Sequence, residues 1–220
     1  MSITNSKIQL SDTTLVCIDC VDANRAARAI AKTMSMFEFG KVIFFTDKSF
    51  SMNGVDVIKI PSITSKTEYS KFMIRDLVDY IDTYWIMTVQ WDGFPINMDA
   101  FTHDYFSYDY IGAPWVRHLM YNIPGYPKVD ETNIVGNGGF SIRKRNIMHL
   151  AKKISEQSRF LDIGEAEDCY ISRTIRNELE GVGVVFAPVA LALGFSFENL
   201  PYSGQFGFHG KRTMEINGWI

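Results

Sequence analysis

The sequence predicts a single α/β domain over residues 1–220, with a mixed, mostly parallel central sheet flanked by helices. Two observations carry this prediction. The amino-terminal part alternates short apolar runs with segments whose apolar residues recur at helical spacing, which is the pattern of β-α-β units. The composition is 46% hydrophobic and 14% aromatic, so a chain of this length can bury one sizeable core without disulfides or metals.

The amino-terminal elements follow one another through short connections. The run Val42-Ile43-Phe44-Phe45 is apolar at every position, as expected of a central parallel strand that is covered on both faces. Ala26, Ile30 and Met34 recur at helical spacing and predict a helix around them. In chain order we expect strand 14–18, helix 22–36, strand 41–46, strand 55–60, helix 67–81 and strand 84–89.

The carboxyl-terminal part is less regular. Residues 94–133 are rich in aromatic side chains, and no helix or strand is predicted among them. Beyond them lies a glycine turn at residues 136–139. After the turn we expect strand 140–142, helix 145–155, helix 167–179 and strand 182–187.

The charge distribution disfavours nucleic acid as a partner, although it does not exclude it. The formal net charge is −3, from 22 basic and 25 acidic side chains that are scattered along the chain. A protein that grips nucleic acid needs a basic stripe or patch to neutralise phosphates. Any contact with phosphate is therefore expected to be local.

The cysteines and the hydropathy pattern predict a cytoplasmic location. Cys17, Cys20 and Cys169 cannot all pair, which favours a reducing compartment. Cys17 and Cys20 have the spacing of a redox pair but end an apolar strand, so redox chemistry is not expected. We find neither a signal peptide nor an apolar run of about 18 residues, the length that a membrane span needs.

Acidic residues follow the predicted strands, where ligands of open α/β sheets collect. Asp19 follows the first strand, and Asp92 follows the strand that ends at Val89. A single carboxylate can hold Mg²⁺ or Mn²⁺ when phosphate and water supply the remaining ligands. Asp92-Gly93 can equally be an ordinary turn after a strand.

Three further segments carry candidate residues. The turn Gly136-Asn137-Gly138-Gly139 exposes backbone amides to a ligand, although an isolated turn of this kind is often a hairpin. Glu167 and Asp168 begin a predicted helix, where a carboxylate either caps the helix or acts as a general base. His209 lies in a glycine-flanked aromatic segment and suits a metal or a phosphate, or a structural role.

The motifs together resemble a family of uncharacterised glycosyltransferase-like domains with the GT-A fold, over roughly residues 13–210. Such enzymes carry, in order, a nucleotide-binding β/α half, an acidic DxD motif, a glycine loop, an xED motif and a late histidine. The fragments that carry the resemblance are Gln90-Trp91-Asp92-Gly93-Phe94, Asp109-Tyr110-Ile111-Gly112-Ala113-Pro114-Trp115, Val135-Gly136-Asn137-Gly138-Gly139-Phe140-Ser141, Glu167-Asp168 and Phe206-Gly207-Phe208-His209-Gly210.

The resemblance implies a donor half at about 13–93 and an acceptor and catalytic half at about 94–210. Asp92 and His209 would hold Mn²⁺ or Mg²⁺ on the donor diphosphate, and Asp168 would be the general base, with Glu167 in reserve. Gln90 stands where a full motif has an acidic residue, which puts the metal in doubt. The other residues implied to contact the donor or acceptor are Asp19, Tyr69, Lys71, Gln90, Gly138, Gly139 and Trp115.

Two of these residues have competing explanations. Lys71 could be a solvated helix charge instead of a nucleotide contact, and Trp115 could belong to the core instead of stacking on a sugar ring.

The expected function is transfer of a sugar from a nucleotide-sugar donor to an acceptor hydroxyl, with inversion and metal assistance. The acceptor classes left open are a glycan, a glycoprotein and a modified nucleobase. A non-catalytic carbohydrate- or nucleotide-binding module on the same fold is the alternative, and a nucleotide-sugar hydrolase is a third reading.

Overall fold

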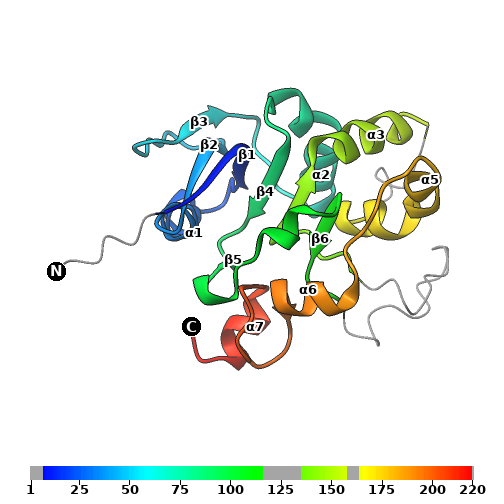
Figure 1. The fold of residues 1–220 in the computed structure, drawn as a ribbon. Coiled ribbons are helices and arrows are strands. Elements are labelled where there is room, and N and C mark those ends of the chain that lie inside the picture. Colours follow the sequence, from blue (N-terminus) through cyan, green and yellow to red (C-terminus); the bar gives the residue numbers. More distant parts are fainter. Residues whose placement is uncertain (1–6, 116–134, 158–163, 220) are drawn as a thin grey trace.

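The computed structural model describes residues 7–115, 135–157 and 164–219, and its centre is a six-stranded sheet (Figure 1). The strand order is β3-β2-β1-β4-β7-β6. Strands β3, β2, β1 and β4 are parallel to one another, and β7 is antiparallel to both of its neighbours. The strands are β1 Ile8–Ile18, β2 Phe37–Thr46, β3 Asp56–Lys59, β4 Trp85–Val89, β6 Tyr110–Gly112 and β7 Ser141–Lys144. The predicted α/β class with a mixed, mostly parallel sheet is confirmed.

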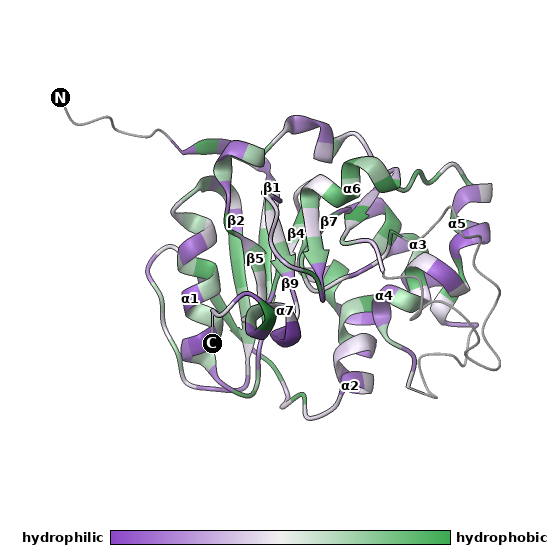
Figure 2. Ribbon diagram, turned by 90° about the horizontal axis from the view of Figure 1, so that it is seen from below, coloured by the Kyte–Doolittle hydropathy of each residue, from purple (hydrophilic) through white to green (hydrophobic). Residues whose placement is uncertain are grey.

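Helices cover both faces of this sheet because its strands are apolar on both sides. Along β1, Val16 packs into one core cluster while Leu15 and Cys17 pack into the other. The first cluster lies under α2 Lys66–Lys71, α3 Arg145–Ser155, α4 Glu167–Cys169 and α5 Arg176–Gly181, and the second under α1 Ala23–Met34 and α6 Val189–Phe195. The green strands of Figure 2 show how apolar the sheet is, whereas α1 mixes apolar and hydrophilic residues.

A second, smaller sheet lies beside the large one and holds the carboxyl-terminal histidine. Its strand order is β5-β9-β8, with β5 antiparallel and β8 parallel to the central β9. The strands are β5 Gly93–Pro95, β8 Ser196–Glu198 and β9 Gly207–His209, and α7 Lys211–Ile216 follows β9 directly. Because β5 begins just after β4, this sheet joins the carboxyl end of β4 to the end of the chain (Figure 1).

Two predicted helices are present but change their hydrogen-bonding pattern part-way. Helix α2 continues into a π-helical segment, Phe72–Asp76, and a short 3₁₀ turn, Leu77–Tyr80. Helix α4 likewise continues into a π-helical segment, Tyr170–Thr174, before α5. π-helical turns widen a helix locally and are frequent at functional sites. Both segments here follow a helix that carries candidate site residues.

The predicted strand 182–187 is wrong. Only Phe186 pairs in that segment, through an isolated bridge to Tyr110. The Asp109 carboxylate accepts the N–H of Val185 at 2.7 Å, and two backbone hydrogen bonds, at 2.7 and 2.9 Å, join Val185 and Ala187 to Asp109 and Tyr110, which is too short a series for a strand. Gly183 has a φ of +92°, which turns the chain out of an extended path. The elements α6, β8, β9 and α7 were not predicted, because each is short.

The 3₁₀ turns Met98–Ala100 and His103–Phe106 and strand β6 lie in the segment for which no regular structure is predicted. Residues 116–133 of that segment lie outside the described residues. Within the described ranges, no helix combines the length and the apolar composition that a membrane crossing requires.

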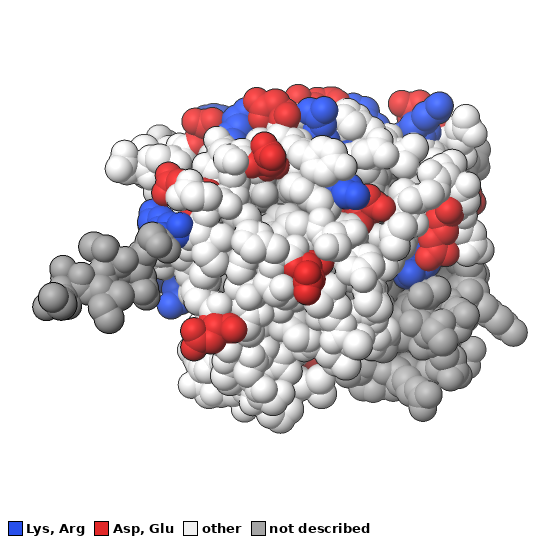
Figure 3. All heavy atoms as spheres, viewed as in Figure 1, with Lys and Arg blue, Asp and Glu red and all other residues white. Residues whose placement is uncertain are grey.

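On the face in Figure 3, the described basic and acidic side chains lie next to one another and form no continuous basic stripe.

Candidate functional site

A cleft lies at the carboxyl ends of β1 and β4, where the strand order reverses. From β1 the chain first adds β2 and β3 on one side, and β4 then pairs with β1 on the other. Ligands of open α/β sheets bind in the crevice at such a switch point. The cleft has a volume of about 240 Å³, and its lining includes Asp19, Arg25, Tyr69, Gln90 and Trp91.

The glycine turn reaches the same edge of the sheet because β7 runs antiparallel to β4. Ser141, the first residue of β7, pairs with Thr88 near the end of β4. The turn that precedes Ser141 therefore lies beside the residues that follow β4. The end of β6 joins it there, since the N–H of Asn137 donates to the carbonyl of Ala113 at 3.1 Å.

Asp19 is a buried carboxylate that is already paired. The Nε of Arg25 donates to its Oδ2 at 2.7 Å, and the amides of Val21 and Asp22 donate to its Oδ1 at 2.7 and 3.0 Å. The Arg25 guanidinium in turn lies 4.7 Å from the centre of the Trp91 ring. Asp19 thus lines the cleft, as expected. Its hydrogen bonds, however, are used to orient Arg25 and, through it, Trp91.

Gln90 connects the cleft to the small sheet through its side-chain amide. Its Nε2 donates to the Tyr69 hydroxyl at 2.8 Å, and its Oε1 lies 3.1 Å from Nε2 of His209. Burial raises the pKa of Tyr69 above its ordinary value, so this hydroxyl stays protonated at neutral pH. Tyr69, Gln90 and His209, which are far apart in sequence, therefore form one hydrogen-bonded chain.

His209 is held on the central strand of the small sheet by both neighbours. Gly93 pairs with it from β5 and Glu198 from β8. A Cβ at Gly93 would lie 2.8 Å from Cδ2 of the ring, and a Cβ at Gly139 would overlap the ring itself. Neither position therefore tolerates a side chain while the imidazole keeps this orientation.

The ring nitrogens of His209 both face oxygen acceptors. Nδ1 lies 3.3 Å from Oε1 of Glu198, and Nε2 faces the amide oxygen of Gln90. Burial disfavours the charged imidazole, but the hydrogen bond to Glu198 and the nearby carboxylates of Glu198, Asp92 and Asp168 raise the pKa of His209. The arrangement suits an imidazolium that donates from both nitrogens.

Asp92 lies next to His209, since its carbonyl accepts the N–H of Gly210 at 2.7 Å. Its carboxylate accepts no hydrogen bond from any residue that the structure describes. Among those residues no group of three or more His, Cys, Asp or Glu side chains is placed to hold a metal ion. A histidine ligand must offer a free lone pair, and both ring nitrogens of His209 already face oxygen atoms, of Glu198 and of Gln90, so a divalent ion bound by Asp92 and His209 does not fit unless one of these contacts is broken.

Asp168 is brought to the other side of the glycine turn. Its Oδ2 accepts the N–H of Gly138 at 3.2 Å, and its Oδ1 accepts the N–H of Cys169 at 2.7 Å. Burial, followed by the neighbouring carboxylate of Glu167, raises the pKa of Asp168 to about 7. A carboxyl group with this pKa can exchange a proton near neutral pH, which is the property of a general base.

Glu167 has a different environment although it is the adjacent residue. It is buried, and its Oε1 accepts Nη2 of Arg143 at 2.7 Å. Arg143 is itself fully buried, and its Nη2 also donates to the carbonyl of Gly138 at 3.1 Å. Glu167 therefore serves to hold Arg143 under the glycine turn, which leaves Asp168 as the carboxylate that faces the site.

Two predicted donor or acceptor contacts lie elsewhere. Lys71 lines a separate hollow with Lys59, Glu68 and Asp76, so the structure does not bring it to the cleft that contains Tyr69. Trp115 is 8% exposed, and a Cβ at Gly136 would overlap its indole ring. In the described part of the chain, Trp115 is thus a packing residue beneath the turn.

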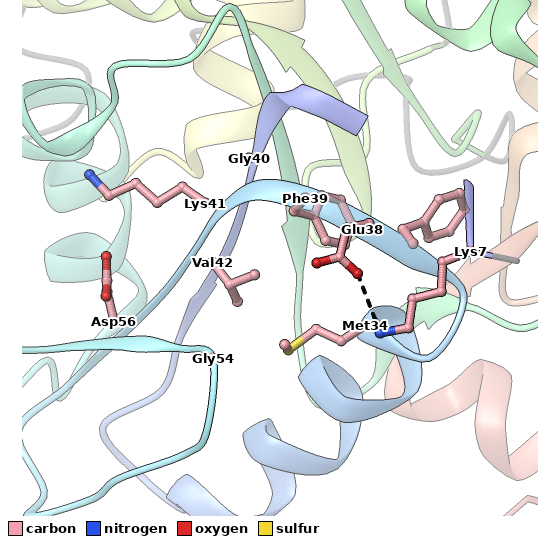
Figure 4. Close-up of a pocket in the computed structure, with 10 residues that line it drawn as sticks. Lys7, Met34, Glu38, Phe39, Gly40, Lys41, Val42, Gly54 and Asp56 are labelled. Atoms are coloured by element: carbon pink, nitrogen blue, oxygen red, sulfur yellow. Dashed lines mark ion pairs between the residues drawn. The ribbon is translucent and has the colours of Figure 1, made fainter. Parts of the chain in front are cut away.

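A further cavity lies at the opposite, amino-terminal end of β2 (Figure 4). It measures about 330 Å³, and Met34, Val42 and Gly54 are among its lining residues. Lys7 and Glu38 form an ion pair across its rim at 3.6 Å. None of the predicted site residues lines it.

The sequence interpretation missed Arg143, Glu198 and Arg25. Arg143 follows Ser141 and Ile142 in β7, so an arginine at an inward-facing position of a short strand was the available signal. Glu198 ends β8 and is found only through the pairing of β8 with β9. Arg25 lies in the first turn of α1, where an arginine is usually a solvent-exposed helix residue.

The comparisons with known proteins support a family assignment. The family described as protein of unknown function (DUF5672) matches residues 54–209. The chain belongs to this family. The DUF5672 match begins just before β3 and ends at His209, the last residue of β9. It therefore includes Tyr69, Gln90, the glycine turn and Asp168, and it leaves out β1 with Asp19. A comparison with curated proteins finds no match.

Proposed function

We propose that this protein transfers a sugar from a nucleotide-sugar donor to an acceptor hydroxyl, on a GT-A-like fold. The observation that carries the proposal is an unbroken series of contacts from the switch-point cleft to Asp168. Gln90 joins the cleft to His209, the His209 ring packs on Gly139, and the preceding residue, Gly138, donates its N–H to Asp168. A donor bound in the cleft would extend toward His209 and Asp168, the residues that could act on it.

The fold supports the donor end of this proposal. The resemblance in the sequence implies a mostly parallel β/α half that binds the nucleotide, and β3, β2, β1 and β4 are parallel. Trp91, with Arg25 against its ring, lies at the mouth of the cleft and offers an aromatic face for a base. The nucleotide would occupy this cleft, and its diphosphate would point toward His209.

The chemistry is a direct displacement. Asp168 takes the proton of the acceptor hydroxyl, the acceptor oxygen forms a bond to the anomeric carbon, and the bond from that carbon to the phosphate oxygen breaks. The nucleoside diphosphate leaves with the electron pair, and the configuration inverts. A positive group beside the leaving phosphate stabilises the charge that develops there. His209, between Glu198 and Gln90, would supply this positive group.

A non-catalytic nucleotide- or carbohydrate-binding module is the second candidate. The neutral Gln90 favours it, because this residue occupies the position of an acidic one in the motif that the sequence resembles. Such a module would use the same cleft without needing a base. The two functions therefore differ in what happens when Asp168 loses its carboxylate.

A thermal-shift panel tests the proposal. Nucleoside diphosphates and their sugars are added to the wild type, to Asp168→Asn and to the exposed control Asp99→Asn, because a ligand that binds the folded state raises the melting temperature. We expect one base to raise the melting temperature of all three proteins. Sugar transfer or slow donor cleavage is expected in the wild type and the control, and is lost in Asp168→Asn. Binding with no cleavage in any protein would favour the binding module.

A further inference from the structure

Backbone pairing in the small sheet fixes the position of His209 and of the residues around it. Glu198 of β8 and Gly93 of β5 pair with it from opposite sides. The hydroxyl of Thr213 donates to the carbonyl of His209 and accepts the N–H of Asn199 at 2.8 Å. The strand that carries Glu198 and the strand that carries His209 are thereby joined a second time.

The two ring nitrogens have no lone pair to offer to a metal. Glu198 can only accept a hydrogen bond when ionised, so Nδ1 donates to it. Gln90 uses its NH₂ group on Tyr69 and presents its carbonyl oxygen to Nε2, so Nε2 donates as well. His209 is then a cation at the point where a metal-dependent transferase would place a divalent ion. A cation here repels a second one and attracts an anion.

We propose that the His209 imidazolium, held by Glu198, binds the donor diphosphate in place of a divalent metal ion. This inference rests on the proposed function. A phosphate oxygen is ionised and is a stronger acceptor than an amide oxygen, so it replaces Oε1 of Gln90 at Nε2 of His209. Glu198 is then a positioning residue, and Asp92 is a neighbouring negative charge that takes no part in binding the phosphate.

The role of Asp92 separates this inference from metal-dependent binding. If Asp92 held a metal ion on the diphosphate, Asp92→Asn would abolish binding. If the imidazolium holds the diphosphate directly, the same substitution, tested at pH 6 so that the imidazole stays charged without the help of Asp92, removes a negative charge near the phosphates and leaves binding equal or tighter. Asp92 is partly exposed, and its carboxylate accepts no hydrogen bond from a described residue, so Asp92→Asn is expected to fold.

Isothermal titration calorimetry decides between the two. Inorganic pyrophosphate and a set of nucleoside diphosphates are titrated into the full chain in EDTA, in MgCl₂ and in MnCl₂. We expect the Kd in EDTA to lie within about twofold of the values with metal, and Asp92→Asn to bind at least as tightly. Glu198→Gln is expected to weaken binding about tenfold, while the exposed control Glu215→Gln leaves it unchanged.

The outcomes also distinguish this inference from the proposed function. Binding of a nucleoside diphosphate that requires Mg²⁺ or Mn²⁺ and is lost in Asp92→Asn would overturn the inference and leave the proposed function standing. If pyrophosphate binds in EDTA but no nucleoside diphosphate does, the result would support the phosphate site at His209 and contradict a nucleotide sugar as the donor. Failure of every probe to bind in EDTA would overturn the inference.

Discussion

Asp19 and Asp168 are carboxylates at the two ends of the candidate site, and their surroundings differ. Both accept two backbone N–H groups. Asp19 also has a cation of its own, Arg25. The nearest partner of Asp168 is another carboxylate, Glu167, and the cation in that region, Arg143, pairs with Glu167.

This difference separates a structural region from a reactive one. Around Asp19 the charges are matched, so the carboxylate fixes the shape of the cleft. Near Asp168 the cations Arg143 and His209 are ion-paired with Glu167 and Glu198, so burial and the Glu167 carboxylate raise the pKa of Asp168 to about 7. Strongly perturbed carboxylates of this kind concentrate at functional sites. The predictions that follow probe each region in turn.

The largest effect is expected from Arg143→Met, which removes the cation beneath the glycine turn. Glu167 would keep a buried charge with no partner, and the carbonyl of Gly138 would lose a donor. Breaking a buried ion pair from one side costs about 3–5 kcal/mol of unfolding free energy. Urea denaturation at pH 7.5 measures the loss. Arg212→Met, at an exposed ion pair, is the control and should cost no more than about 0.5 kcal/mol.

Gly139→Ala is expected to cost less, because the clash is with a side chain. The added Cβ would overlap the His209 ring, which must then leave its position between Gln90 and Glu198. Overpacking of this kind costs about 1–3 kcal/mol. The control is Gly181→Ala, where a Cβ meets no atom within 4 Å. Equal stability of the two variants would contradict the close packing of the ring on the turn.

Asp19→Asn isolates the ion pair with Arg25. An asparagine can still accept the two backbone amides through Oδ1, but its NH₂ group would face the guanidinium. We expect a loss of about 1–2 kcal/mol, since the Arg25 side chain is 25% exposed and water screens part of the interaction. Asp22→Asn keeps a helix cap and serves as the control. If Asp19→Asn lost more unfolding free energy than Arg143→Met, the expected order of the two regions would be wrong.

The smallest effect has the opposite sign. The folded protein keeps the Asp168 proton up to about pH 7, whereas the unfolded chain loses it near the ordinary value of 3.8. The wild type therefore loses stability as the pH rises between these values, and Asp168→Asn does not. At pH 8 the variant should therefore melt at a higher temperature than the wild type. At pH 4 the difference should vanish, and a lower melting temperature at pH 8 would contradict the raised pKa.

The amino-terminal fold could be predicted from the sequence because local pattern decides it. The apolar run in β2 and the helical spacing in α1 are sufficient to assign both elements. Helix α3 was predicted with the bounds that the structure gives. The carboxyl-terminal elements could not be found in this way. Strands β8 and β9 are three residues each, and they exist because β9 pairs with β8 on one side and with β5 on the other.

The sequence pointed to residues of the candidate site by their type, but only in part to the residues that contact them. Asp168, Gly138 and His209 stand out because acids, glycines and histidines at turns and element ends suggest chemistry. The partners that set their properties, Arg143 and Glu198, come from other strands, and the two chain positions in each pair meet only after folding. Lys71 illustrates the reverse case, since its place beside Tyr69 in the sequence did not put it in the same cavity.

The most direct test of Asp168 as the general base of the proposed reaction is release of nucleoside diphosphate from the donor that the thermal panel selects, with water replacing the acceptor. The account predicts release by the wild type, and a rate about 10²–10⁴-fold lower for Asp168→Asn with unchanged donor affinity, which is the usual loss when a general base is removed. Equal rates of release for the two proteins would contradict the assignment of Asp168 as the base.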